Sequence, residues 1–85
     1  MPHILVKLMP GRSAAQKQAL TDAIVREGMN ALGNDAEALS VAFEEVPAAE
    51  WDNRVFEPDI LNHWNRLTKE PGYGRRPDQP ARSKT

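Results

Sequence analysis

The chain has 85 residues, no cysteine and a formal net charge of −1. This length allows one small domain with a thin core, and the missing cysteines exclude a disulfide framework. The two histidines are isolated and the charge is nearly balanced, so neither a structural metal nor nucleic-acid binding is indicated. Without a long apolar run or a signal-peptide pattern, we expect no membrane span and a cytoplasmic protein. So small a chain often gains buried surface by forming an oligomer.

The opening segment, residues 2–9, predicts a β-strand. Every second residue is apolar and faces one way, namely Ile4, Val6 and Leu8. Period-two alternation with β-branched side chains is typical of a strand, and Pro10-Gly11 breaks the pattern.

A helix is predicted next. Ser13 and Gln16 have the spacing of a capping box, in which the serine side chain covers a free N–H group and the glutamine reaches back. Apolar residues then recur at helical spacing up to about Leu32. Gly33-Asn34 is a C-terminal stop signal.

The second predicted strand covers residues 39–46 and is ended by Pro47. Its apolar face carries Leu39, Val41 and Phe43. A strand, a helix and a strand joined by short connections predict an α/β fold. This would be a βαβ unit with parallel strands and a right-handed crossover. Two strands alone make a marginal sheet, so we expect dimerisation to complete it.

The remaining residues predict a short C-terminal helix and a tail. Residues 55–67 carry a second helical apolar pattern with Pro58 in its first turn, and Pro71-Gly72 stops it. Residues 74–85 are rich in proline and basic groups, and we interpret them as a mobile tail rather than a polyanion site. The predicted organisation is therefore one domain over residues 1–73 followed by the tail.

Pro2 is the candidate catalytic residue, provided that Met1 is removed. A proline at a free N-terminus is a secondary amine, whereas an internal proline nitrogen has no basicity. An ordinary α-amino group titrates at about 7.7–8.0, and both burial and a nearby cation lower this pKa. An amine tuned toward neutrality is a good general base. An isolated Met-Pro, however, more often only starts a strand.

Several short segments, in their order and spacing, resemble the 4-oxalocrotonate tautomerase family. They are Pro2, Gly11-Arg12-Ser13, Gln16-Lys17, Ser40-Val41, Glu45-Val46 and Trp51. The stretch from Trp51 to Tyr73 resembles the longer PptA-type branch, so the resemblance covers about residues 2–73. It implies a tautomerase-like βαβ fold, a homo-oligomer and no cofactor or metal. For this branch it favours a dimer over a hexamer.

The resemblance also implies roles for four residues. Pro2 matches the catalytic base. Arg12 matches an arginine that binds the substrate carboxylate and helps keep the amine neutral; by residue type alone it would be a surface arginine at a turn. Trp51 matches an aromatic wall of the pocket, and a plain core or interface residue is the equal alternative. Ser40 stands where the founding members carry a second arginine.

Ser40 changes the expected substrate. A hydroxyl is a weaker electrophile than a cation, so a monoacid or an aromatic enol such as phenylenolpyruvate is favoured over a diacid. Arg54 or Arg66 of a neighbouring subunit is an alternative source of the lost charge. His3, beside the base, either tunes it or is simply a strand residue.

The sequence thus predicts a small isomerase that interconverts enol and keto forms of a 2-hydroxy or 2-oxo unsaturated or aryl acid. Pro2 would act as general base and then as general acid, with Arg12, Trp51 and Ser40 binding the substrate. One alternative is a dehalogenase or decarboxylase of the same superfamily, with Glu44 or Glu45 activating water. The other is a non-catalytic dimeric binding module of the same fold.

Overall fold

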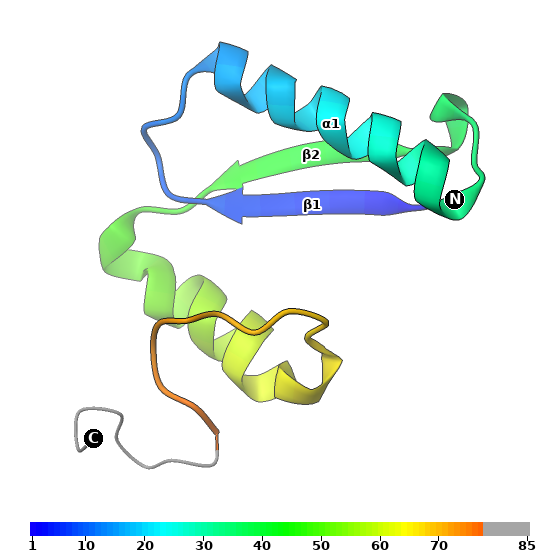
Figure 1. Ribbon diagram of the computed structural model, residues 1–85. Helices are drawn as coiled ribbons and strands as arrows, with labels where there is room; N and C mark the ends of the chain where they lie inside the picture. The colour runs from blue at the N-terminus through cyan, green and yellow to red at the C-terminus, as the bar shows by residue number, and fades with distance from the viewer. Residues whose placement is uncertain (78–85) are drawn as a thin grey trace. The chain divides into compact units, whose positions relative to one another are not determined.

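A computed structural model describes residues 1–77 and divides the chain into two compact units, which separate between Val46 and Pro47. The first unit contains β1 (His3–Leu8), α1 (Ala14–Leu32), a short 3₁₀ turn η1 (Ala36–Ala38) and β2 (Ser40–Glu45) (Figure 1). The two strands pair in parallel, with α1 in the connection between them. The predicted βαβ unit is therefore confirmed.

The register of the two strands decides which side chains share a face. His3 lies opposite Ser40, Val6 opposite Phe43 and Leu8 opposite Glu45. Side chains alternate between the faces of a sheet, so Val6 and Phe43 face one side and the His3–Ser40 pair faces the other. In Figure 1, α1 runs along one face of this two-stranded sheet. On the other face, Leu5 stays 47% exposed.

Both ends of α1 have the caps that the sequence predicted. The Ser13 side chain accepts a hydrogen bond from the Gln16 N–H group at 3.1 Å, and Gln16 Oε1 accepts one from the Ser13 N–H group at 2.8 Å. At the other end, Gly33 takes the left-handed conformation (φ 71°) and its N–H group donates to the Met29 carbonyl at 2.9 Å. The helix therefore begins and ends where local hydrogen bonding dictates.

The second unit is helical but not α-helical. It contains η2 (Ala48–Glu50), a π-helix η3 (Asp52–Ile60) and a 3₁₀ helix η4 (Leu61–Arg66). We predicted Pro58 in a first helical turn, and this is wrong because the helix begins at Asp52 and Pro58 lies well inside it. Proline cannot donate a backbone hydrogen bond and its ring crowds the preceding turn, so a wider π turn is a physical solution at this point.

The predicted tail is only partly described. Residues 78–85 lie outside the described part of the chain, whereas Arg75 and Arg76 make specific side-chain contacts within the second unit. None of the helices in residues 1–77 is both long enough and apolar enough to cross a membrane.

Replacing Gly33 by alanine should lower the free energy of unfolding by about 1 kcal/mol, because a Cβ atom disfavours the left-handed conformation. Gly72→Ala is the matched control, because Gly72 has no positive φ and nothing lies within 4 Å of an added Cβ. Urea denaturation of both variants measures the difference. Equal stabilities would mean that Gly33 does not need its left-handed conformation.

Candidate functional site

The two strands begin side by side, and their first residues bring together Pro2, His3 and Ser40. The Ser40 N–H group donates to the Pro2 carbonyl at 3.2 Å, which extends the ladder by one residue beyond β1. His3 Nδ1 and Ser40 Oγ are hydrogen-bonded at 2.7 Å. Pro2 is half-buried, while Met1 in front of it is 100% exposed. The candidate base therefore precedes His3 in the chain and is hydrogen-bonded through its carbonyl to Ser40.

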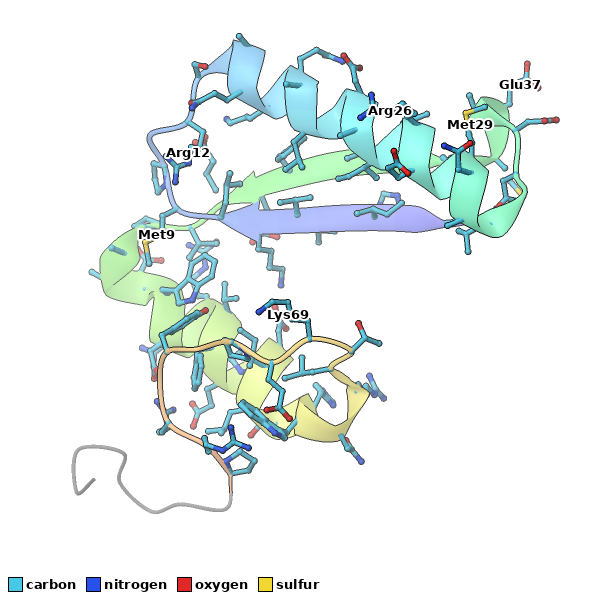
Figure 2. All side chains as sticks on the ribbon, viewed as in Figure 1. Met9, Arg12, Arg26, Met29, Glu37 and Lys69 are labelled. Atoms are coloured by element: carbon cyan, nitrogen blue, oxygen red, sulfur yellow. The ribbon has the colours of Figure 1, made fainter. Side chains whose placement is uncertain are left out.

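Arg12 lies at the opposite end of the same strand, where β1 and β2 finish (Figure 2). It borders a cavity of about 230 Å³ between α1 and the sheet. The cavity is lined by Leu8, Arg12, Gln16, Lys17, Leu20 and Phe43. Two cations and an amide on an otherwise apolar wall suit a carboxylate with an apolar tail.

The two cations of this cavity differ in their partners. Lys17 forms an ion pair with Glu45 at the end of β2. Arg12 has no ion pair within residues 1–77. Arg12 is therefore the cation in this cavity that is available to an anionic ligand, and its guanidinium offers the forked donors that a carboxylate accepts.

One chain does not bring Pro2 and Arg12 together. The six residues of β1 separate them, and at about 3.3 Å per residue this strand spans about 20 Å. Ser40 lies beside Pro2, so the structure places the four predicted site residues in three places. These are the start of the sheet, its end and, for Trp51, the second unit.

Trp51 is half-buried and its indole N–H group donates to Tyr73 Oη at 3.1 Å. The Tyr73 ring in turn contacts Phe56, with 5.6 Å between the ring centroids. Sequence reasoning missed Tyr73, because no local pattern links two residues that are 22 positions apart.

Arg75 binds the residue that follows Trp51. Its guanidinium donates to both carboxylate oxygens of Asp52, at 2.7 and 3.3 Å. These hydrogen bonds hold the pKa of Asp52 below its ordinary value, although desolvation acts in the opposite direction. A carboxyl group with a lowered pKa stabilises the fold above the ordinary Asp value of about 3.9, and this contribution is lost as the pH falls below it.

The other residues that the sequence suggested for the site are already paired or lie in the second unit. Arg54 donates to Glu50 at 2.7 Å, Arg66 is the last residue of η4, and Glu45 is the partner of Lys17. Residues 1–77 contain no group of three His, Cys, Asp or Glu side chains that could hold a metal ion.

Comparison with known proteins identifies the family of this protein. Residues 2–52 match the family described as "Tautomerase enzyme". The chain is 46% identical over 80 residues to a "Probable tautomerase" of Xylella fastidiosa, an alignment that covers 94% of this chain and 98% of that protein. It is 35% and 36% identical over 74 residues to "Tautomerase PptA" of Pectobacterium carotovorum and Cronobacter sakazakii, covering 86% of this chain and 97% of each relative.

The chain therefore belongs to the 4-oxalocrotonate tautomerase family and has relatives in its PptA-type branch. These relationships support a tautomerase, which is an isomerase.

Ser40→Ala should change the ¹⁵N chemical shifts of the His3 ring, because it removes the hydrogen-bond partner of Nδ1. The ring of His63, in the second unit, is the internal reference and should keep its shifts. Because both partners are exposed, we expect a loss of less than about 1 kcal/mol in unfolding free energy. Unchanged His3 shifts would show that the pair does not form in solution.

Proposed function

We propose that the protein is a cofactor-independent keto–enol tautomerase in which Pro2, freed by removal of Met1, is the general base and acid. The observation that carries this proposal is the family match, which begins at Pro2 itself. The complete exposure of Met1 also supports it, because an exposed first residue is accessible to an aminopeptidase.

The proposed reaction needs an anchor and a proton carrier. Arg12 binds the substrate carboxylate at the cavity, and its charge also favours the neutral form of a nearby amine. The Pro2 nitrogen takes a proton from the enol oxygen or a carbon atom and returns it to another carbon. Restricted rotation of the pyrrolidine ring holds the nitrogen in place for both transfers.

The site is proposed to form between two copies of the chain. A single small acid cannot contact Pro2 and Arg12 across about 20 Å of β1, and this supports a site in which the two residues come from different copies. The open two-stranded sheet supports this assembly, because its unpaired strand edges and the exposed Leu5 leave room for a partner. We propose a homodimer rather than a hexamer, as the resemblance to the PptA-type branch implies.

The proposed substrate is an acid with one carboxylate and an apolar or aromatic tail, such as an aryl enolpyruvate. Arg12 is the unpaired cation of the cavity, and Leu8, Leu20 and Phe43 supply apolar walls. Trp51 is proposed to add an aromatic wall, and Ser40 a weak hydrogen-bond donor near Pro2. The alternative reaction with activated water was predicted to use Glu44 or Glu45, and of these two Glu45 is already the ion-pair partner of Lys17.

Pro2→Ala should reduce kcat/KM for a 2-hydroxy aryl acid by up to about 100-fold, because a freely rotating primary amine replaces the secondary amine that the ring holds in place. Intact-protein mass spectrometry first confirms that Met1 is absent. The matched control keeps the proline but blocks its nitrogen with an N-terminal extension, and this protein should be impaired at least as much, because it has no free amine at Pro2. Full turnover by the blocked protein would exclude Pro2 as the base.

Arg12→Gln should lower kcat/KM by about 10- to 100-fold, through the loss of charge-assisted hydrogen bonds to the substrate. Arg26→Gln removes the same charge from an exposed part of α1, 63% exposed at its side chain, and should be nearly neutral.

Mixing the Pro2→Ala and Arg12→Gln subunits tests the shared site directly. Half of the randomly formed dimers are mixed and each of these has one intact site, so about a quarter of the wild-type activity should return. No recovery after verified subunit exchange would contradict a site built from two copies.

A further inference from the structure

The orientation of Trp51 is fixed by one acceptor. An indole N–H group only donates, and Tyr73 Oη accepts from Trp51 Nε1 at 3.1 Å. Rotation of an aromatic ring about its second side-chain torsion is broadly permitted, so packing alone defines the ring orientation weakly. A fixed oxygen at the indole edge selects one orientation and therefore decides which face and edge of the ring a ligand meets.

Tyr73 is itself held against a buried ring. Its centroid lies 5.6 Å from that of Phe56, which is only 2% exposed. The next residue, Gly74, has φ +80°, and a Cβ atom there would lie 2.5 Å from the Phe56 ring. Only glycine therefore lets the backbone lie so close to Phe56 while Tyr73 reaches Trp51.

The two residues after Gly74 are arginines, and both bind side chains of the second unit. Arg75 lies over the Phe56 ring at 5.2 Å and donates to both oxygens of Asp52, the neighbour of Trp51 in the chain. Arg76 lies over the Trp64 ring at 5.1 Å and donates to Glu70 at 3.3 Å. We call residues 73–76 the C-terminal strap, because each of them contacts an aromatic ring of the second unit.

We propose that Tyr73 is a positioning residue, which the C-terminal strap holds so that Trp51 presents a defined aromatic wall to the tail of the substrate. This inference rests on the proposed function of Trp51 as part of the substrate site. It assigns substrate selectivity to residues beyond the family match, which ends at residue 52. An aryl tail, which stacks on a fixed ring, depends on Tyr73 more than a small aliphatic tail does.

Tyr73→Phe tests the proposal, because it removes the acceptor and keeps the ring that packs on Phe56. In a ¹H–¹⁵N spectrum, the indole signal of Trp51 should move and that of Trp64, the other tryptophan, should not. KM for an aryl enol acid should rise about 2- to 10-fold, as expected for one neutral hydrogen bond, with kcat changed less than KM. KM for a short aliphatic enol acid should change less than KM for the aryl acid.

Two further variants separate positioning from simple structural damage. In a Trp51→Phe background, Tyr73→Phe should have no additional effect on KM, because its target is gone. Gly74→Ala should reproduce the Trp51 signal change by lifting the C-terminal strap, whereas Gly72→Ala, with open space around it, should not.

Two results of these experiments would overturn the proposal. An unmoved Trp51 signal, or a moved signal with unchanged KM for the aryl acid, overturns the proposal. The spectrum reports on Trp51 without any turnover, so it remains informative if the protein with a blocked Pro2 nitrogen proves fully active and the proposed function fails.

Discussion

The parallel pairing of β1 with β2 determines where the candidate groups of the first unit lie. Its register brings Ser40 beside His3 and Pro2 at one end and brings Glu45 beside Leu8 at the other. The cap at Ser13 starts α1 just beyond the second end, which places the Arg12 cavity there. The length of one strand therefore separates the candidate base from the candidate anion-binding cation.

In the proposed dimer, the stability of the first unit and the assembly of the catalytic site both depend on association. The first unit buries one hydrophobic side chain, Val46, and none in α1. A two-stranded sheet with one helix is a marginal structure on its own. In the proposed dimer, association of two copies buries more apolar surface and also brings Pro2 of one copy toward Arg12 of the other. A substitution that weakens association would therefore reduce activity without touching any group that contacts the substrate.

Local patterns predicted most of the first unit, because its strands and caps depend on neighbours in sequence. Ser13, Gln16 and Gly33 were identified from spacing alone, and the structure confirms each of them. Pro58 was misplaced because proline favours a first turn, and local rules do not reveal that η3 is wound as a π-helix. The Trp51–Tyr73 hydrogen bond has no local signature, since the fold of the whole second unit creates it. The distance between Pro2 and Arg12 follows from strand length, once the strand is assigned.

The charge of the Arg12 cavity bears on what it can bind. Two cations line it, and two free cations would suit a dianion. Glu45 neutralises Lys17, so the cavity has about one net positive charge for a ligand. A second carboxylate would have to displace Glu45 or stay in solvent, whereas an apolar tail could contact Leu8, Leu20 and Phe43. The pairing of Lys17 with Glu45, together with a serine at position 40, thus supports the proposed monoacid substrate over a diacid.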